Sequence, residues 1–315
     1  MAIASSSEQK VHAAYPEVRH HPDPAALIAD PDVDLVIVTT PNDTHVPLAE
    51  AALAAGKHVV VEKPVALDAA QTERLVAAAA GAREKGLVTS VFHNRRWDGD
   101  FLTILDAIDR GLVGRPVSLE SRFDRFRPEP RQRWREVPGP GSGLWADLGP
   151  HLVDQALVLF GRPEWVSADI ATVRDGAQVD DDAHVVLGYD RLRVVLGAST
   201  LAARPGPRFV LHGTTGTLVI EGLDPQEPQL ADGHLPGQEG YGLGASDATL
   251  TTAEGTSTIP RLRGGYLDFY TRLRDAILGL DDAPVTVEEA LVVMQVIDAA
   301  RLSSTEGRRV TGETA

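Results

Sequence analysis

Three short apolar runs alternate with two helical patterns between residues 35 and 92, and this alternation limits the folds open to the chain. Runs rich in valine and isoleucine, without a polar face, are typical of strands buried on both sides. Strands that alternate with helices predict a parallel, doubly wound sheet. The expected strands are 35–38, 57–62 and 87–92, and the expected helices are 46–55, ended by Gly56, and the stretch from the capping residue Asp68 to about Lys85, ended by Gly86.

The tripeptide Glu62-Lys63-Pro64 closes the second of these strands. In an open parallel sheet, ligands bind just beyond the carboxyl ends of the strands, so we expect Lys63 to project into that crevice. Pro64 fixes φ and ends the strand, which holds the lysine at a defined height. The alternative interpretation is an ordinary surface lysine after a strand.

A carboxylate and an imidazole stand four residues apart in the segment Asp147-Leu-Gly-Pro-His151. The stretch from Leu148 to Phe160 is expected to form a helix, with Asp147 as its N-cap and Pro150 in the first turn, where proline is tolerated. Asp147 and His151 would then share one face, where the carboxylate orients the ring and raises its basicity. Such a pair can act as a general base toward a hydroxyl proton. The alternative is a capping aspartate followed by an ordinary helix histidine.

The chain of 315 residues is acidic, with a net charge of −15, and it contains no cysteine. The charge argues against nucleic acid or an anionic membrane as a partner. The absence of cysteine excludes disulfides and thiolate metal sites. No apolar run is long enough to cross a bilayer and no signal peptide is evident, so a cytoplasmic location is expected. The length predicts two domains, and an apolar content of 43% is enough for sizeable cores.

The pattern changes near Trp97, so we expect domains at 1–96 and 97–315. After a helix at 101–109, extended segments joined by short turns favour a mostly antiparallel open sheet in an α+β domain. Residues 224–258 are polar and rich in Gly and Pro and are expected to be mostly loop, and residues 306–315 are expected to be frayed. The expected strands are 116–126, 166–173, 184–189, 192–199, 209–212 and 217–221, and the last two expected helices are 265–278 and 287–302.

Six segments, taken in order, resemble the Gfo/Idh/MocA oxidoreductases, the group that includes glucose–fructose oxidoreductase and inositol dehydrogenase. Within that family, the chain is most similar to the branch of NADP-dependent scyllo-inositol dehydrogenases. The resemblance implies a dinucleotide-binding Rossmann domain followed by a domain for substrate binding and oligomerisation. It also implies hydride transfer between NAD(P) and a sugar or a cyclic polyol such as an inositol. The six segments are 39–45, 62–64, 93–98, 124–128, 133–136 and 147–155.

The resemblance also implies roles for particular residues. Lys63, Asp147 and His151 are the expected catalytic residues, and together with Arg127 they are expected to bind the substrate. Lys63 would stabilise charge that develops on the reacting oxygen, while His151, held by Asp147, would take the proton. The residues expected to bind the cofactor are Ser5, Ser6, Thr40, Pro41, Asn42, His45, Glu62, Lys63, Asn94, Trp134 and Arg135.

Several of these residues also have a plain structural interpretation. Pro41-Asn42 is a good turn pair, and His45 could simply help to cap the next helix. Arg96 could be a solvated arginine of a domain linker. The arginines between residues 127 and 135 could form a solvated basic loop, or a loop that grips cofactor phosphate or substrate oxygens.

The phosphate-binding turn of a Rossmann fold marks the main departure from the family pattern. No Gly-x-Gly-x-x-Gly turn with its strand and helix is found in the sequence from Met1. That turn normally brings N–H groups to the pyrophosphate, so we expect this chain to bind NADP(H) weakly. Either the chain starts at a downstream methionine of a longer gene, which we favour, or it is a truncated relative without dehydrogenase activity. Ser5-Ser6-Ser7 and Lys10, in place of the usual acidic residue, suit the 2′-phosphate of NADP, although Glu8 keeps NAD possible.

Two other functions are open to this fold, and each explains the sequence less well than hydride transfer. A non-catalytic regulator that binds sugar or dinucleotide on the same fold would fit the missing glycine turn, but not the retained Lys63, Asp147 and His151. A metal ion held by Asp147, His151 and either His93 or His184 ranks lower, since Lys63 would repel a cation. An open sheet in the second domain would leave one face to be covered, so a homodimer or tetramer through that sheet is expected.

Overall fold

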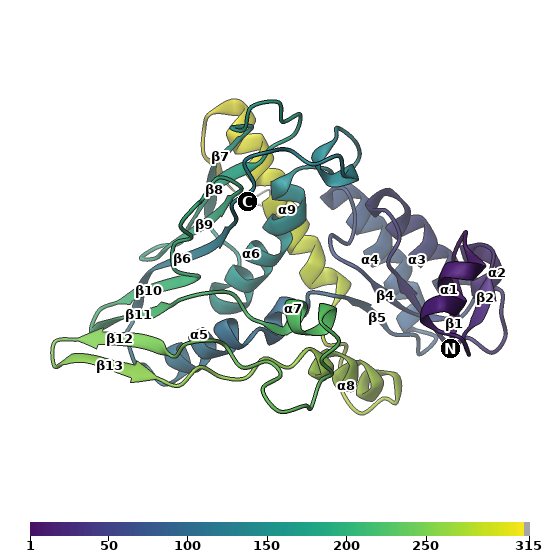
Figure 1. Ribbon diagram of the computed structural model, residues 1–315. Helices are drawn as coiled ribbons and strands as arrows, with labels where there is room; N and C mark the ends of the chain where they lie inside the picture. Colours follow the sequence, from purple (N-terminus) through teal and green to yellow (C-terminus); the bar gives the residue numbers. More distant parts are fainter. Residues whose placement is uncertain (312–315) are drawn as a thin grey trace. The chain divides into compact units, whose positions relative to one another are not determined.

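The computed structural model describes residues 1–311, and these residues form two compact units (Figure 1). The first unit contains Met1–Phe92 together with Arg272–Leu291, and the second contains His93–Thr271 together with the segment that begins at Val292. The sequence had suggested a division after Arg96 and a second domain without interruption. The segment 272–291 instead groups with the first unit.

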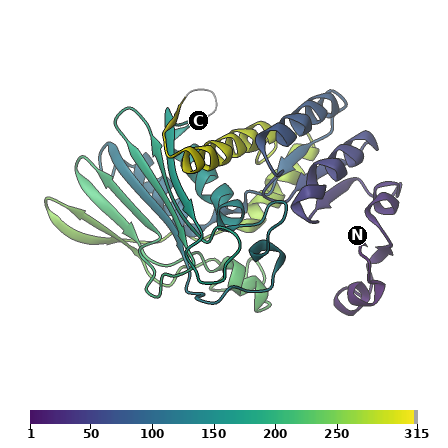
Figure 2. The ribbon, with the colours of Figure 1, turned by 90° about the horizontal axis from the view of Figure 1, so that it is seen from above.

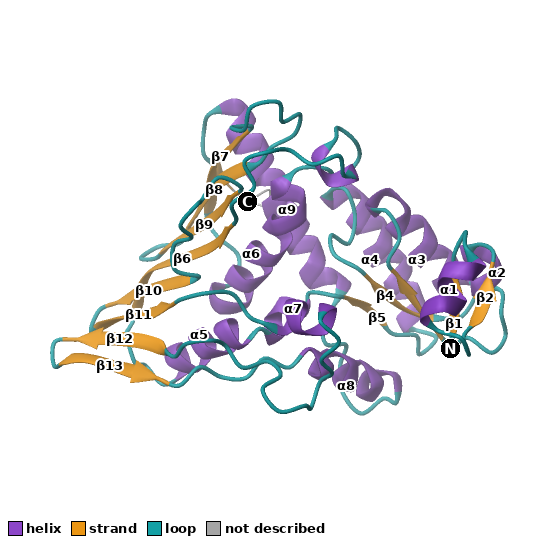
Figure 3. Ribbon diagram, viewed as in Figure 1, coloured by secondary structure: helices purple, strands orange, loops and turns teal. Residues whose placement is uncertain are grey.

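Helices and strands alternate through the first unit (Figure 3). Asp68 caps α4 as predicted, because its side chain accepts a hydrogen bond from the N–H of Gln71. The strands are β1 (Ala2–Ala4), β2 (Arg19–His21), β3 (Leu35–Val38), β4 (His58–Val61) and β5 (Thr89–Val91), and the helices are α1 (Glu8–Ala14), α2 (Pro24–Ile28), the 3-10 helix η1 (Asn42–Thr44), α3 (His45–Ala54) and α4 (Ala69–Arg83).

Strand pairing in the first unit is parallel. Strands β3, β4 and β5 form a three-stranded sheet in that order, and β1 and β2 form a separate two-stranded sheet. In the central strand β4, residues Val59, Val60 and Val61 are fully buried. Helices α3 and α4 pack on each other, and α3 also packs on β3 and β4. Buried β-branched strands joined by helical crossovers give the predicted Rossmann-type parallel sheet, and this part of the fold prediction is confirmed.

The second unit contains one large sheet and the helices that accompany it. Helices α8 and α9 each begin in one unit and end in the other. The helices are the 3-10 helix η2 (Asn94–Trp97), α5 (Gly99–Asp109), the 3-10 helix η3 (Trp134–Glu136), α6 (Leu144–Phe160), α7 (Gln226–Ala231), α8 (Tyr266–Ile277) and α9 (Val287–Glu306), and the strands are β6 (Pro116–Asp124), β7 (Trp165–Ala171), β8 (Asp182–Gly188), β9 (Arg193–Ser199), β10 (Phe209–Gly213), β11 (Gly216–Ile220), β12 (Ala248–Thr252), β13 (Gly255–Ile259) and β14 (Val310–Thr311).

The nine strands lie in the order β13-β12-β11-β10-β6-β9-β8-β7-β14. Neighbouring strands are antiparallel except β6 and β9, which run parallel from Ser118↔Arg193 to Asp124↔Ser199. The long crossover through α6, β7 and β8 joins these two strands and allows the parallel pairing. Helix α6 packs against β6, β8 and β9 on one face of the sheet (Figure 2). The predicted mostly antiparallel α+β domain is confirmed.

The region 224–258 is mostly loop, as the sequence predicted. It also contains α7, β12 and the first residues of β13, which the sequence did not predict. In β12, Ala248 and Leu250 are buried while Thr249 and Thr251 are exposed, an alternation that the surrounding Gly and Pro residues obscured.

Residues 306–311 are more ordered than predicted. Val310 of β14 pairs with Val166 of β7, which adds an edge strand to the sheet, and Ser303 Oγ donates to the carbonyl of Arg308 at 2.7 Å. The rest of the predicted frayed end, residues 312–315, lies outside the described residues. None of the helices described in residues 1–311 is long and apolar enough to span a membrane.

Candidate functional site

The loop after β3 is tied to the loop after β4 by the buried side chain of His45. Its ring nitrogen Nδ1 lies 2.9 Å from the carbonyl oxygen of Pro64, and Nε2 lies 2.8 Å from that of Thr40. Thr44 reinforces the same loop, since its hydroxyl donates to the carbonyl of Pro41 at 2.7 Å. His45 therefore holds the carboxyl ends of two parallel strands together, where a ligand of this fold class binds.

Lys63 is the first residue beyond the pairing of β4. The N–H of Glu62 still donates to the carbonyl of Val38 at 2.9 Å, and the N–H of Lys63 then turns to the Glu62 carboxylate at 2.7 Å. The Lys63–Pro64 peptide bond is cis. The structure thus places Lys63 at the carboxyl edge of the three-stranded sheet, as the sequence predicted. Asn42 lies at the same edge, buried in η1.

Ser5 and Ser6 follow β1. The Ser5 hydroxyl accepts a hydrogen bond from the N–H of Ser7 at 3.2 Å, and Ser7 in turn caps α1 by accepting from the N–H of Lys10. Ser6 is exposed. This turn chemistry accounts for two of the three serines and leaves the Ser6 side chain directed to the surface.

Helix α6 begins one turn earlier than predicted, so Asp147 is not its N-cap. Gly143 occupies that position with φ +102, and the carboxylate of Asp180 accepts from the N–H of Trp145 at 2.6 Å. Asp180, in the loop before β8, thus provides the capping that the sequence interpretation gave to Asp147. Pro150 lies inside the helix, beyond its first turn.

Asp147 and His151 nevertheless lie one turn apart on α6, as the predicted pair requires. His151 is buried, and its ring lies 6.4 Å from that of Phe123 on β6. Asp147 forms an ion pair with Arg135, with 3.3 Å between Oδ1 and Nε. The expected base and its carboxylate therefore occupy the first half of a helix that the sheet supports.

The segment after β5 is not a solvated linker, which corrects the structural interpretation of Arg96. Its guanidinium binds both oxygens of the buried Asp154 on α6, with the shortest distance 2.7 Å from Nη2 to Oδ1. Asn94 and His93 are also buried. Asp154 is 58 residues from Arg96 in the sequence, and the ion pair with its carboxylate keeps the Arg96 side chain inside the fold instead of in solvent.

A cavity of about 450 Å³ opens in the second unit beside the start of α6. It brings together Arg127, Trp134, Arg135 and Asp147, all of which the sequence selected as site residues. The guanidinium of Arg135 also stacks over the Trp134 ring at 4.4 Å. The further lining residues are Arg125, Arg133, Glu136, Gly143, Leu144, Arg174, Asp180, Asp181 and Thr200.

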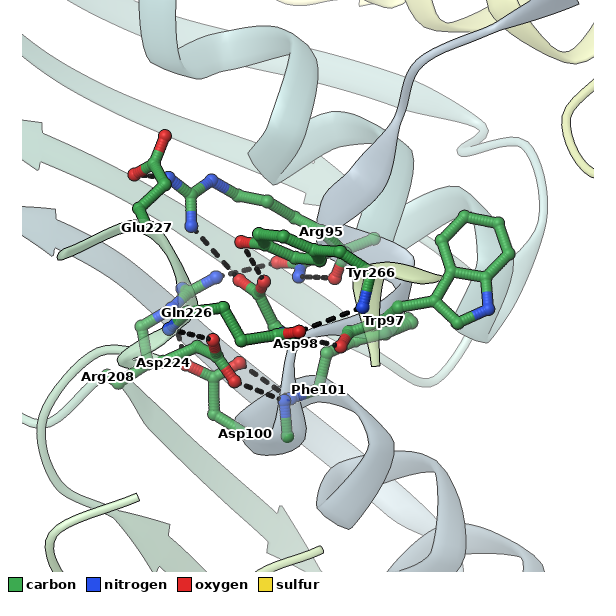
Figure 4. Close-up of polar contacts among 12 residues, drawn as sticks. Arg95, Trp97, Asp98, Asp100, Phe101, Arg208, Asp224, Gln226, Glu227 and Tyr266 are labelled. Atoms are coloured by element: carbon green, nitrogen blue, oxygen red, sulfur yellow. Dashed lines mark hydrogen bonds and ion pairs between the residues drawn. The ribbon is translucent and has the colours of Figure 1, made fainter. Parts of the chain in front are cut away.

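A second group of charges, which the sequence did not predict, lies in the interior of the same unit (Figure 4). We call it the buried charge cluster. Its guanidinium groups and carboxylates come from η2, the start of α5, the residue before β10, the segment before α7 and the segment after β13. The members are Arg95, Asp98, Asp100, Arg208, Asp224 and Arg261.

Close contacts hold this cluster together. Arg95 lies 3.1 Å from Asp98, whose other oxygen accepts from the Tyr266 hydroxyl at 2.7 Å (Figure 4). Burial, with the neighbouring charge of Asp100, raises the pKa of Asp98 to about 8, although Arg95 opposes the shift. Burial lowers the pKa of Arg208 to about 10, against the effect of Asp100 and Asp98. The doublet Asp98-Gly-Asp100 so close to Arg95 was the one signal in the sequence that could have indicated this cluster.

No group of three acidic or histidine side chains that could hold a metal ion occurs among residues 1–311. The expected cofactor residues Thr40, Pro41, Asn42, His45, Glu62 and Lys63 gather at the carboxyl edge of the parallel sheet in the first unit, and Trp134 and Arg135 gather at the cavity of the second.

Comparison with known proteins agrees with this architecture. Residues 1–93 match a family model described as an oxidoreductase family with an NAD-binding Rossmann fold, and residues 106–311 match the C-terminal alpha/beta domain of the same family. The chain belongs to the Gfo/Idh/MocA oxidoreductase family. It is therefore an oxidoreductase whose first unit is a Rossmann-like domain for a nicotinamide cofactor.

Relatives of this chain include two bacterial oxidoreductases. It is 46% identical to the uncharacterized oxidoreductase YdgJ of Escherichia coli, over 94% of this chain and 86% of the relative. It is 37% identical to scyllo-inositol 2-dehydrogenase (NADP(+)) IolW of Bacillus subtilis, over 98% of this chain and 87% of the relative. The solved structure of YPO2259 from Yersinia pestis is 44% identical, with a TM-score of 0.93 over 99% of this chain and 88% of that one.

Proposed function

We propose that this protein is an NADP-dependent dehydrogenase that acts on the CH–OH group of a sugar or a cyclic polyol such as an inositol. The observation that carries the proposal is the position of Lys63 two residues after β4, whose three valines are fully buried, at the ligand-binding edge of the sheet. The similarity to the scyllo-inositol dehydrogenase IolW supports the substrate class.

The proposed chemistry divides between the cofactor and the side chains. When bound, the nicotinamide accepts or supplies the hydride. Lys63 stabilises negative charge on the reacting oxygen, and His151 holds or releases the hydroxyl proton. Asp147, whose carboxylate lies 3.3 Å from Arg135, orients the base from one helical turn away.

The preference for NADP rests on the turn after β1. Ser6 is exposed there, and Lys10 lies in the first helix, while no acidic side chain follows the strand directly. Hydroxyl groups and a cation suit a 2′-phosphate, whereas an acid would suit the ribose hydroxyls of NAD. The name of the relative IolW, an NADP(+) enzyme, agrees with this preference.

We also propose a homodimer or tetramer that forms in the cytoplasm through the open face of the large sheet. Helix α6 packs on one face, and Figures 1 and 2 show no described helix over the opposite face. An uncovered sheet face favours contact with a second copy. Light scattering at micromolar concentration would return the mass of a monomer if this proposal were wrong. A regulator without catalysis is less favoured, because the relatives are named as oxidoreductases or dehydrogenases.

The test of the enzyme is reduction of NADP⁺ in the presence of scyllo-inositol and related polyols. We expect Lys63→Ala and His151→Ala each to lower kcat by about 100-fold or more. Lys85→Ala and His184→Ala are the matched controls, because both side chains are exposed and lie outside the proposed site.

The assay is run on the 315-residue chain and on a form extended before Met1 by a strand, a Gly-x-Gly-x-x-Gly turn and a helix. We expect the extended form to bind NADP⁺ more tightly, since such a turn supplies N–H groups to the pyrophosphate. Equal affinity of the two forms for NADP⁺ would contradict that expectation. Turnover that survives both Lys63→Ala and His151→Ala would contradict the assignment of the catalytic residues.

A further inference from the structure

The cavity beside α6 concentrates positive charge in a chain whose net charge is −15. Five of its lining residues are arginines and four are acidic. An excess of arginine in a concave site of an acidic protein requires a physical reason, because like charges repel one another when they are held close. The five arginines are Arg125, Arg127, Arg133, Arg135 and Arg174.

The acidic residues of the cavity are already engaged. Arg174 is almost fully buried and binds Asp181 at 2.8 Å and Glu136 at 3.0 Å. Glu136 also accepts from the N–H of Arg131 at 2.9 Å, and these bonds lower its pKa although burial opposes the shift. Asp180 caps α6, and Asp147 pairs with Arg135.

Three arginines remain without a carboxylate. Within the described residues, no acidic oxygen lies within 4.0 Å of the guanidinium groups of Arg125, Arg127 or Arg133. Burial and the charges of Arg125, Arg131 and Arg133 lower the pKa of Arg127, with Glu136 opposing the shift. A bound anion would remove this repulsion and would gain charge-assisted hydrogen bonds.

Backbone hydrogen bonds fix the segment that carries Arg125 and Arg127 before any ligand binds. The N–H of Arg125 donates to Ser199 at 2.9 Å and that of Arg127 donates to Thr200 at 2.7 Å, while Phe126 between them bridges to Leu201. In such an extended segment, alternate side chains point to the same side. Arg174 also donates to the carbonyl of Arg127 at 3.0 Å, so the buried arginine anchors the segment that carries Arg127. Groups held in place in this way bind without a large ordering cost.

We propose that the substrate carries a carboxylate or phosphate group and that Arg125, Arg127 and Arg133 bind this group in the cavity. The proposal rests on the proposed dehydrogenase function, because Asp147 of the expected catalytic pair lines the same cavity. The planar guanidinium fork matches the geometry of both anions. A volume of about 450 Å³ lies within the range of small-molecule sites.

The first experiment measures binding without turnover. Inorganic phosphate and D-glucuronate are titrated into the full chain by calorimetry, with D-glucose as the neutral counterpart of glucuronate. We expect Arg127→Gln to weaken binding of both anions by about 10- to 100-fold, the effect of losing a hydrogen bond to a charged group. Arg110→Gln is the control, because Arg110 pairs with Asp106 on the exposed side of α5. Equal binding of phosphate by Arg127→Gln and the wild type, or binding by neither, would overturn the proposal.

The second experiment separates the possible sources of the anion. If the group belongs to the substrate, Arg127→Gln should lower kcat/KM for glucuronate about 10- to 100-fold more than it lowers kcat/KM for glucose. If the variant instead weakens NADP⁺ relative to NAD⁺, the arginines read the 2′-phosphate of the cofactor and the substrate assignment is wrong. If neither sugar is turned over, the proposed function is wrong for these substrates. The calorimetric result still decides whether the cavity binds anions. Thermal melts of each variant establish that it is folded.

Discussion

Arg208 is the side chain whose removal should cost the second unit the most stability. It is fully buried and donates to Ser121 Oγ and to Gln155 Oε1, both at 2.6 Å. Its Nε lies 3.6 Å from the carboxylate of Asp100. Leucine at position 208 would leave the Ser121 hydroxyl, the Gln155 amide oxygen and the Asp100 carboxylate buried without their contact to the guanidinium. Removing one member of a buried charge pair costs about 3–5 kcal/mol in the free energy of unfolding.

Two features of the structure bear on where the value falls within this range. Asp100 keeps a second partner, Arg261, at 3.4 Å, which reduces the loss. The Arg208 guanidinium also lies 4.0 Å from the ring centroids of both Phe123 and Phe209, and that contact is lost as well. We therefore expect Arg208→Leu to lower the free energy of unfolding by about 3–5 kcal/mol. Since 1 kcal/mol shifts the Tm of a domain of 150–250 residues by about 2–4 °C, the Tm should fall by about 6–20 °C.

Urea denaturation and calorimetry measure this effect, with Arg110→Leu as the matched control. Arg110 pairs with Asp106 at 2.8 Å, but its side chain is 56% exposed, so we expect the control to lose about 0.5 kcal/mol or less. Salt at 1 M should remove the small effect at Arg110 and leave the effect at Arg208. A loss below about 1 kcal/mol for Arg208→Leu would refute the expectation that the buried Arg208 side chain stabilises the second unit.

Three further predictions concern other parts of the chain. Gly143→Ala should lose about 1–3 kcal/mol, because φ is +102 and an added Cβ would overlap the Asp180 carboxylate; unchanged urea denaturation would contradict this. Ser90→Ala should lose about 1–2 kcal/mol, since the buried Ser90 hydroxyl donates to the carbonyl of Val285 at 2.8 Å; an unaltered melting curve would count against that bond. The raised pKa of Asp98 contributes stability that is fully present below pH 3.8 and is lost as the pH rises to about 8. Asp98→Asn should remove this part of the pH dependence of stability. If the free energy of unfolding changes with pH in the same way for the variant and the wild type, Asp98 is not its cause.

Local patterns in the sequence were sufficient for the first unit and for the placement of Lys63. The valines of β4 lie at the centre of a parallel sheet, and such strands are recognisable because both of their faces are apolar. Asp68 caps α4 by accepting a hydrogen bond from Gln71, only three residues later in the sequence. The start of α4 could therefore also be predicted from neighbouring residues. Both features depend only on residues that are close together in the sequence, so one sequence is enough to predict them.

Features that depend on distant partners could not be read in this way. Helix α6 starts at Leu144 because Asp180, 35 residues from Trp145, supplies its capping carboxylate. Arg95 is buried because Glu227, 132 residues away, accepts its hydrogen bond at 2.6 Å. The return of segment 272–291 to the first unit likewise rests on contacts such as Ser90 with Val285. An isolated arginine or aspartate carries no mark of such a partner, so the sequence suggested solvated or capping residues instead.

Arg208 and Arg127 both lie in the second unit, but their surroundings differ. We therefore expect their substitutions to have opposite effects on stability. Arg208 is fully buried against acceptors and a carboxylate, so its charge is compensated inside the fold and its loss is costly. Arg127 is only partly buried and faces other arginines, so its charge is compensated by water and opposed by its neighbours. Arg127→Gln should therefore leave the Tm unchanged or raise it slightly, because repulsion is relieved and no carboxylate within 4.0 Å is lost among the described residues. Inorganic phosphate should raise the Tm of the wild type by mass action and have less effect on Arg127→Gln. A Tm that falls as far for Arg127→Gln as for Arg208→Leu would mean that both arginines serve the fold, and the cavity would then have no charge reserved for a ligand.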